Sequence, residues 1–272
     1  MSLRRTPGVI CQCQTGTPVD EGTLSRSWTG LPGTTGGSAS ARVAASAIYD
    51  SVVSQTPVTM SWDSIRLAAQ VARTNAQSAI ACSIGLTMSE AVYGFTVRQV
   101  AELYLDVREQ GSNRGTEVEA FLSESGGSAG NSWCAAFVSH CHYEAASFLC
   151  ASTTCTHTVR AVAMVFDGRD ASNLTFSKQR VLSGEFTPIA GDVMVMVTQG
   201  SIHNLDEGKP RVQLKGHTGI VQSYTSATQV LHTVEGNTDG SGSRNGDGVY
   251  ERTDRMSDDR LWGFMRPRVV WI

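Results

Sequence analysis

Cys134 is the residue in this sequence best placed for nucleophilic chemistry. It lies in the run Trp133-Cys134-Ala135-Ala136-Phe137-Val138, at the predicted start of a helix over 133–149 and directly after the glycine-rich loop 126–132. Unpaired amides and the positive end of the helix dipole at such a position favour thiolate over thiol. A free cysteine is also a common small, buried side chain on a packed helix face. The thiol therefore needs a partner base before it indicates an enzyme.

His217 is the candidate base. The run Gly216-His217-Thr218-Gly219-Ile220-Val221 places it at the head of a predicted strand, between glycines that let another group approach closely. The following strand ends in Val234-Glu235-Gly236-Asn237-Thr238. Because Glu235 and Asn237 are two positions apart, we expect both side chains on one face of the sheet, where they would orient and polarise the imidazole. Cysteine, histidine and an orienting group follow the logic of a catalytic triad.

Helices in the first half of the chain and strands in the second half must position these residues. Apolar residues at helical spacing predict helices over 39–55, 61–86, 96–109 and 133–149, with a short helix through Val118 and Leu122. Ser61 fits an N-cap, and Thr96-Val97-Arg98-Gln99 reads as a capping box. Apolar and β-branched runs predict strands over 192–197, 219–224, 229–234 and 261–272. This order predicts an α+β fold.

The motifs together resemble a known family. The nucleophile run, Gly191-Asp192-Val193, the His217 run and Glu235-Gly236-Asn237-Thr238 are similar, in order and spacing, to the CHAP family of cysteine, histidine-dependent amidohydrolases and peptidases. Two further runs look like members of the same pattern, Glu109-Gln110-Gly111-Ser112-Asn113-Arg114-Gly115 and Gly263-Phe264-Met265-Arg266-Pro267. The resemblance covers residues 96 to 272.

This resemblance implies a fold, a substrate class and residue roles. The implied fold is papain-like, with the nucleophile helix packed on an antiparallel sheet, and the implied substrate is a peptide or amide bond of bacterial peptidoglycan. Carried over by position, Cys134 is the nucleophile, His217 the base and Glu235 the group that orients His217. Asn237 is a further polar member of the site. The expected enzyme is an endopeptidase or an N-acetylmuramoyl-L-alanine amidase, and the residues do not indicate which bond is cut.

We expect three regions along the chain. They are an irregular arm rich in Gly, Ser and Thr over 1–38, an Ala-rich helical region over 39–95 and a CHAP-like catalytic domain over 96–272. The first two contain no wall-binding repeat, so we expect residues 1–95 to dock into a larger assembly such as a virion or a delivery machine. Because no secretory signal opens the sequence, we expect synthesis in the cytoplasm and action at the cell wall, as a phage endolysin or a virion-associated lysin.

Composition limits the class of partner. Lys+Arg 22 against Asp+Glu 25 gives a net charge of −3, and the charges are scattered, so we expect no nucleic-acid partner. No window approaches the roughly 18 uncharged apolar residues of a membrane span, and we expect none. The seven cysteines are odd in number. In a chain long enough to fold without crosslinks, they predict free thiols and a reducing compartment.

Other motifs carry weaker alternatives. Cys150 and Cys155 with His157, or His140 with His142, would suit a zinc ion, but no second pair lies at finger-like spacing. Gly126-Gly127-Ser128-Ala129-Gly130 matches a serine-nucleophile elbow, which requires a strand before it rather than the helix expected there. We interpret 239–250 as a solvated loop and His203 as a surface residue. The sequence thus predicts no metal and no cofactor.

Two functions compete with the cell-wall hydrolase. The first is a structural or assembly protein of a virion or secretion machine, in which residues 1–95 do the main work and the hydrolase domain is vestigial. The second is an amidase for a small molecule such as a glutathione conjugate. Selective alkylation of Cys134 would favour an enzyme, whereas an inert buried thiol would favour the assembly protein.

Overall fold

The structure is a computed structural model of the 272-residue chain. It describes residues 39–56, 58–75, 86–170, 173–200, 214–240, 246–253 and 255–271. The arm expected over 1–38, with Cys11 and Cys13, lies outside these residues, as does His203.

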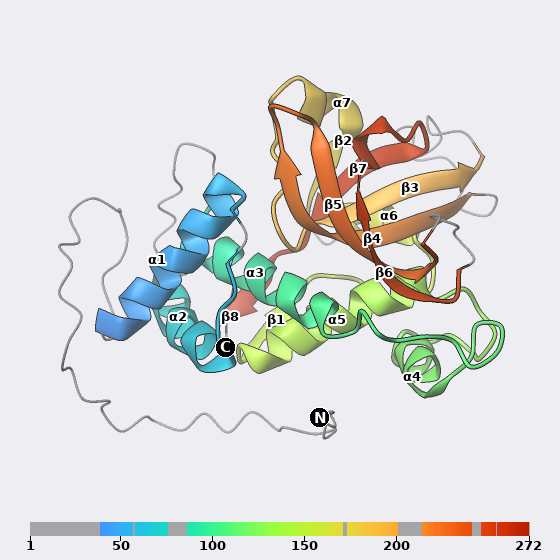
Figure 1. Ribbon diagram of the computed structural model, residues 1–272, viewed down its shortest axis with the longest axis horizontal. Coiled ribbons are helices and arrows are strands. Elements are labelled where there is room, and N and C mark those ends of the chain that lie inside the picture. Colours follow the sequence, from blue (N-terminus) through green and yellow to red (C-terminus); the bar gives the residue numbers. More distant parts are fainter. Residues whose placement is uncertain are drawn as a thin grey trace.

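Helices dominate the first half of the described chain, as predicted. They are α1 Ala39–Ser54, α2 Trp62–Asn75, α3 Met88–Glu102, α4 Thr116–Glu124 and α5 Cys134–Phe148, followed by the shorter α6 Ala163–Asp170 and α7 Lys178–Leu182. Ser61 caps α2 as expected, since its hydroxyl accepts the Ser64 N–H at 3.2 Å. Figure 1 shows α3 and α5 running beneath the sheet, with α1 and α2 at one end of the molecule and α4 at the other.

The strands form one large antiparallel sheet and one small one. Strands β2 Leu174–Ser177, β3 Val193–Gln199, β4 Lys215–Thr225, β5 Val230–Thr238, β6 Gly248–Thr253 and β7 Leu261–Arg266 form a sheet in the order β2-β7-β3-β4-β5-β6. β1 Ala151–Thr153 pairs separately with β8 Val269–Trp271. A short 3-10 helix, η2 Arg255–Ser257, precedes β7. The chain is therefore α+β with an antiparallel sheet, as the sequence predicted.

Strand β3 shows why its sequence is apolar at consecutive positions. Val193, Val195 and Val197 join the core between the sheet and the helices, whereas Met194 and Met196 join a second core on the opposite face. Side chains alternate across a strand, so a strand covered on both faces needs apolar residues throughout. Asp192, just before β3, is buried and accepts Arg266 Nε–H at 2.8 Å, which ties this point to the end of β7.

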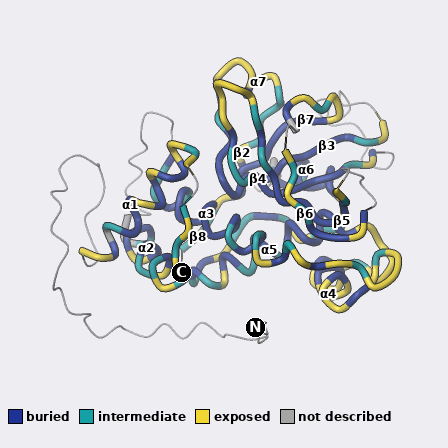
Figure 2. Tube along the Cα trace, viewed as in Figure 1, coloured by how far each residue is buried: buried dark blue, intermediate teal, exposed yellow. Residues whose placement is uncertain are grey.

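Helix α5 is buried because, like β3, it is covered on opposite sides. Its side chains contact α3 on one side and strands β4 and β5 on the other. Figure 2 shows α5 buried along most of its length, whereas most of α4 and of the loop before α5 is exposed. A helix that is apolar around most of its circumference is typical of such a central position.

The predicted helix over 96–109 was wrong at both ends. The capping box that forms is Thr87 with Glu90, so α3 begins at Met88, eight residues before the predicted start at Thr96. Thr96 lies within α3, where its hydroxyl donates to the Val92 carbonyl at 2.7 Å. The helix ends at Glu102 because the chain then turns and pairs with β6, through a bridge between Arg108 and Gly248.

The boundary expected between residues 95 and 96 falls inside α3, which runs without a break from Met88 to Glu102. A single cluster of buried side chains also extends from Ala41 in α1 to Met265 in β7. Gln55, at the end of α1, accepts the Tyr224 N–H of β4 at 2.9 Å. The helices before residue 96 therefore share one core with the rest of the described chain.

The interpretation of 239–250 as a solvated loop was wrong at its C-terminal end. Gly248, Val249 and Tyr250 belong to β6, and Val249 is fully buried. Likewise, the run predicted as one strand over 261–272 divides into β7 and β8, which belong to different sheets. Pro267 falls at the division, consistent with its missing N–H.

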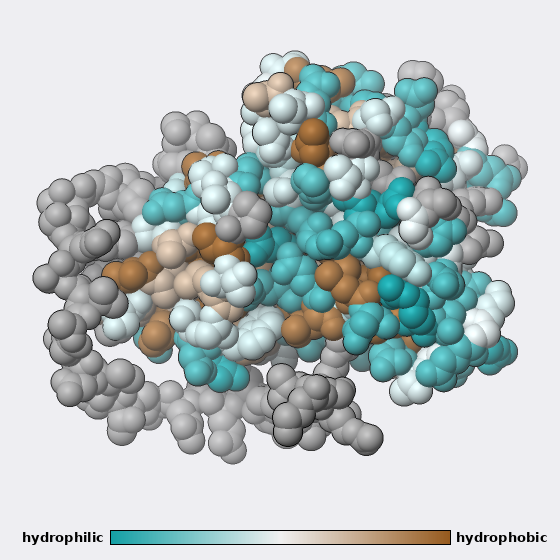
Figure 3. Space-filling view, viewed as in Figure 1, coloured by the Kyte–Doolittle hydropathy of each residue, from teal (hydrophilic) through white to brown (hydrophobic). Residues whose placement is uncertain are grey.

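The outer surface differs between the two ends of the molecule. On the face drawn in Figure 3, apolar side chains gather over α1, while much of the sheet end is hydrophilic. Val53 of α1 is among the exposed apolar residues. Within the described ranges, no helix combines the length and the apolar character needed to cross a bilayer.

Candidate active site

Cys134 opens helix α5, as predicted. The first bond within the helix runs from the Phe137 N–H to the Trp133 carbonyl at 2.9 Å. The amides of Cys134, Ala135 and Ala136 therefore have no acceptor within the helix. These N–H groups and the helix dipole place partial positive charge around the thiol.

His217 and Glu235 lie on paired strands, as the sequence predicted. His217 is on β4 and Glu235 on β5, and His217 Nε2 lies 2.8 Å from Glu235 Oε2. The second carboxylate oxygen of Glu235 accepts the Thr233 hydroxyl at 2.7 Å. Gly219 makes room for this carboxylate, because a Cβ at position 219 would lie 2.5 Å from Glu235 Cγ. Sequence reasoning missed Thr233, which its spacing of two from Glu235 could have indicated.

Cys134 interacts with the other side of the imidazole. His217 Nδ1 is buried and has no hydrogen-bond partner within the described part of the chain. Because Glu235 occupies Nε2, we infer that Nδ1 faces the Cys134 thiol. Burial lowers the pKa of His217, but interactions with Cys134 and then Glu235 outweigh burial and raise that pKa to about 10. Both interactions therefore favour the protonated imidazole.

The three groups are almost completely shielded from solvent. The exposed fraction is 4 % for Cys134, 3 % for His217 and 0 % for Glu235. A shielded site strengthens the interaction between a thiolate and an imidazolium, because water does not screen it. The loop directly before Cys134 is exposed at Asn131 and Ser132. This arrangement can support attack by a thiolate, with His217 delivering and recovering a proton.

Asn237 does not act on the imidazole in the way that strand alternation suggested. Its backbone φ is 55°, and the pairing of β5 with β6 shifts register between Glu235 and Thr238. With its amide oriented to suit its neighbours, Asn237 accepts the Trp133 N–H at 3.2 Å and donates to Gly246 O and Asn113 Oδ1. The left-handed backbone breaks the period of two, so the amide binds the residue before the nucleophile.

The cysteines outside the site correct one expectation. Cys150 is in a disulfide, so the prediction of free thiols was wrong for this residue, and Cys150 is not available as a zinc ligand. Cys141 and Cys155 are buried and are not in disulfides, and burial raises the pKa of Cys155. Among the described residues, no cluster of three or more His, Cys, Asp or Glu side chains is arranged to hold a metal ion.

His140 and His142 point to different neighbours, because residues two apart on a helix leave it on different sides. His140 Nδ1 contacts Glu124 Oε2 at 2.6 Å, and His140 Nε2 contacts Glu144 Oε2 at 3.1 Å. His142 Nδ1 instead lies 2.8 Å from the Tyr93 hydroxyl. Burial lowers the pKa of His142 to about 3, so this imidazole stays neutral.

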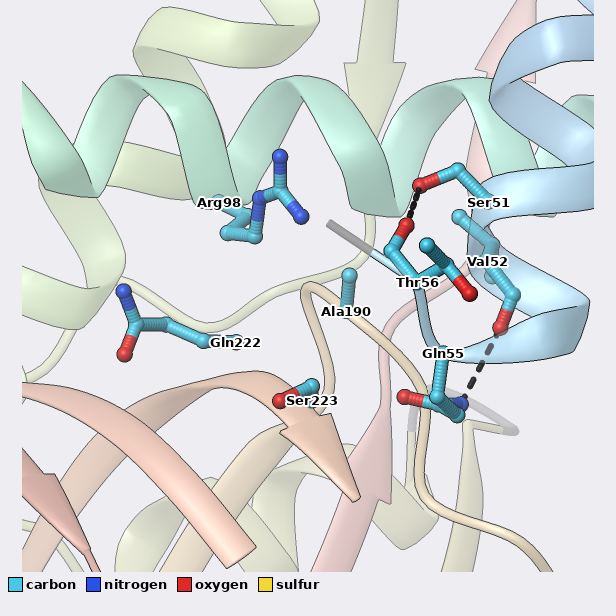
Figure 4. Close-up of a pocket in the computed structure, with 8 residues that line it drawn as sticks. All are labelled: Ser51, Val52, Gln55, Thr56, Arg98, Ala190, Gln222 and Ser223. Atoms are coloured by element: carbon cyan, nitrogen blue, oxygen red, sulfur yellow. Dashed lines mark hydrogen bonds between the residues drawn. The ribbon is translucent and has the colours of Figure 1, made fainter. Parts of the chain in front are cut away.

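A small polar pocket lies away from the candidate site. It is drawn in Figure 4 and is lined by residues of α1, α3, β4 and the segments beside them, namely Ser51, Val52, Gln55, Thr56, Arg98, Ala190, Gln222 and Ser223. Gln222 is five residues along β4 from His217, which corresponds to about 17 Å. The Arg98 guanidinium beside the pocket donates to the Val58 carbonyl at 3.0 Å. We assign this pocket to packing between the helices and the sheet.

Comparison with family models, curated proteins and solved structures found no match to this chain.

Proposed function

We propose that this protein is a cysteine-dependent amidohydrolase or peptidase of the CHAP type, with a papain-like fold, that cleaves a peptide or amide bond of bacterial peptidoglycan. The observation that carries the proposal is the buried chain of contacts from Cys134 through His217 to Glu235. A packing role would require none of these three polar groups to face one another. The choice of peptidoglycan follows the resemblance of the motifs around these residues.

The proposed reaction is acyl transfer. The Cys134 thiolate attacks the carbonyl carbon of the substrate, and the amides that open α5 stabilise the oxyanion. The carbon–nitrogen bond then breaks as His217 gives its proton to the leaving amine. This step leaves a thioester on Cys134 and a neutral imidazole.

Hydrolysis of the thioester completes the cycle. His217 takes a proton from water, and the hydroxide attacks the thioester carbonyl. The carbon–sulfur bond breaks, releasing a carboxylic acid and the thiolate. Glu235 holds the imidazole orientation and stabilises its positive charge in both halves of the reaction. The proposed site needs no metal and no cofactor.

The proposal is tested by digesting purified peptidoglycan of several cell-wall types. Wild type is compared with Cys134→Ala and with Cys141→Ala, which removes another buried thiol from the same helix. New amino termini and fragments are read by mass spectrometry. We expect them with wild type and Cys141→Ala, and we expect at least about a 10³-fold loss with Cys134→Ala. The identity of the new ends names the bond.

The alternative outcomes separate the competing functions. Equal digestion by wild type and Cys134→Ala would exclude Cys134 as the nucleophile. If no wall is cut while Cys134 is still alkylated selectively, the substrate is not peptidoglycan and small amides become the substrates to screen. An unreactive Cys134 together with intact walls would favour the assembly protein with a vestigial hydrolase domain. We also propose delivery as a phage lysin or virion component, through contacts of residues 1–95.

A further inference from the structure

Trp133, the residue directly before Cys134, is held at both of its N–H groups. Its indole Nε1–H donates to Glu109 Oε1 at 2.7 Å. Its backbone N–H donates to the side-chain oxygen of Asn237 at 3.2 Å. Trp133 is fully buried, so each of these donors would be costly to leave without a partner. Both bonds constrain the point at which the chain enters α5.

The same two acceptors are joined to each other through Asn113. The second carboxylate oxygen of Glu109 accepts the Asn113 N–H at 2.7 Å. Asn113 Oδ1 in turn accepts an amide N–H of Asn237 at 3.2 Å, and the other amide N–H of Asn237 donates to Gly246 O at 3.1 Å. Through these side chains and the backbone N–H groups of Trp133 and Asn113, the four residues Glu109, Asn113, Asn237 and Trp133 form a closed ring of hydrogen bonds, which we call the Trp133 ring.

The Trp133 ring joins three segments that are far apart in sequence. Glu109 and Asn113 come from the loop after α3, Asn237 from the end of β5, and Trp133 from the start of α5. Asn113 has a φ of 52°, in the left-handed region that a side chain disfavours. Its carbonyl also accepts the Gly130 N–H of the nucleophile loop at 3.0 Å. Asparagine adopts this conformation more readily than most residues, and these bonds hold it there.

We propose that Glu109 is a positioning residue, which acts with Asn113 through Trp133 and Asn237 to set the place of Cys134 relative to His217. This inference rests on the proposed function, because it assumes that the contact between Cys134 and His217 is the reacting pair. Both amide N–H groups of Asn237 are used in bonds to Asn113 and Gly246, so Asn237 belongs to this ring rather than to the group that receives the oxyanion.

The variant Glu109→Gln tests the role with little change of shape. A glutamine offers one acceptor oxygen and places an N–H group where the second oxygen was, so either Trp133 or Asn113 loses its acceptor. Displacement of a reacting group by about 1 Å can cost about 100-fold in rate. We therefore expect peptidoglycan hydrolysis to fall about 10- to 100-fold. The matched control is Glu117→Gln, which changes an exposed carboxylate on α4.

In the same variants, the rate of Cys134 alkylation by iodoacetamide is measured as a function of pH. This second measurement does not depend on the identity of the substrate. We expect the pH profile of Glu109→Gln to shift to higher pH, since the thiolate loses part of its contact with His217, and we expect Glu117→Gln to retain the wild-type profile. A merely structural role would lower the folded fraction and leave the profile of the folded molecules unchanged. That unchanged profile, with wild-type hydrolysis per folded molecule, would overturn the inference.

A second variant keeps the test decisive if Glu109→Gln folds poorly. Trp133→Phe retains an aromatic ring in the core and removes the indole N–H that Glu109 accepts, together with part of the buried ring volume. We expect a smaller shift in the same direction, and we expect the double variant to shift less than the sum of the single variants. Additive shifts would mean that the two residues do not act through one bond. A shifted profile in a protein that leaves peptidoglycan intact would reject the substrate while supporting the positioning role.

Discussion

At the scale of single residues, the site is a set of buried polar groups that satisfy one another. Glu235 is fully buried, and both of its oxygens accept bonds, from His217 and from Thr233. A buried carboxylate without such partners would be strongly destabilising. The pairing satisfies both oxygens, and the carboxylate in turn helps to raise the pKa of His217.

The raised pKa of His217 predicts the alkaline limit of activity. The value in the folded protein is about 10, above the usual 6.5 of histidine. The imidazolium is therefore retained as pH rises through neutrality and is lost only as pH passes through about 10. Because the imidazolium protonates the leaving amine, we expect hydrolysis to fall over that range. Titration of the His217 ring by NMR measures the pKa directly.

The variant Glu235→Gln measures how much the Glu235 carboxylate contributes to the pH at which activity falls. The variant removes the negative charge, so the pKa of His217 and the alkaline fall in activity should both move to lower pH. Glu251→Gln, on the exposed surface of β6, is the control and should leave both unchanged. An unchanged His217 titration in Glu235→Gln would contradict the role given to the carboxylate.

At the scale of elements, glycines set the distance between α5 and the sheet. A Cβ at Gly236 of β5 would lie 2.7 Å from the Trp133 ring and 2.8 Å from Phe137 Cβ. The helix that carries Cys134 can therefore approach β5 closely only because position 236 has no side chain. The same contact brings the thiol within reach of the imidazole on β4.

Gly236→Ala should move α5 away from the sheet. We expect a loss of about 1–3 kcal/mol in the free energy of unfolding, because the added methyl group overpacks the interface. We also expect slower alkylation of Cys134. Urea denaturation measures the first effect. The control is Gly240→Ala, where the added Cβ would meet nothing within 4 Å. Equal stability of the two variants would show that the interface accommodates the methyl group.

His140 links α5 to α4 and carries a prediction of its own. Burial lowers the pKa of His140, but hydrogen bonds to Glu144 and Glu124 outweigh burial and raise that pKa above its usual value. A histidine whose pKa is raised by folding stabilises the protein fully below pH about 6.5, and that contribution is lost as pH rises through the higher folded value. The charged contact between α4 and α5 should therefore weaken with increasing pH.

The variant His140→Gln tests this pH dependence. We expect wild type to be more stable than the variant by about 1 kcal/mol in mildly acid solution, since both carboxylates are partly exposed. The difference should shrink in alkaline solution. Chemical denaturation at several pH values measures it, with His232→Gln on β5 as control. A difference that grows with pH would have the wrong sign for a protonated His140.

At the scale of the whole molecule, the helical end and the sheet end share one core. The buried cluster extends from α1 to β7, and Gln55 connects the end of α1 to both β4 and the Pro188 carbonyl. Gln55 also has a φ of 56°, which directs the chain back towards the sheet. The described chain should therefore unfold as one unit rather than as two domains divided near residue 95.

Cooperative unfolding is tested with two probes. Circular dichroism in the far ultraviolet follows the helices, and tryptophan fluorescence follows Trp133, Trp262 and the other indoles. We expect coincident transitions. Gln55→Ala should lower the free energy of unfolding by about 1–3 kcal/mol, because it leaves the Tyr224 N–H and the Pro188 carbonyl without this partner. Both transition midpoints should therefore fall together. Gln179→Ala, on the exposed surface of α7, should have little effect. If the circular dichroism signal of the helices were lost at lower denaturant than the change in tryptophan fluorescence, the chain would instead contain separate domains.

The sequence by itself determined those features that depend on local patterns. A glycine-rich loop before an apolar helix predicted the position of Cys134 correctly. Strand periodicity predicted correctly that His217 and Glu235 lie on neighbouring antiparallel strands. The order of helices before strands predicted α+β. These predictions succeeded because caps, periodicity and short hairpin connections are properties of adjacent residues.

Only the tertiary structure decided the features that depend on distant partners. Pairing with β5 brought Gly248 into a strand, and pairing of residue 108 with β6 ended the helix before Glu109. The left-handed backbone of Asn237 turned its amide from the imidazole to Trp133. The strand order β2-β7-β3 likewise joins residues that are far apart in sequence. Such contacts form only when the whole chain has packed, since their energy comes from burial and pairing that no local run of residues contains.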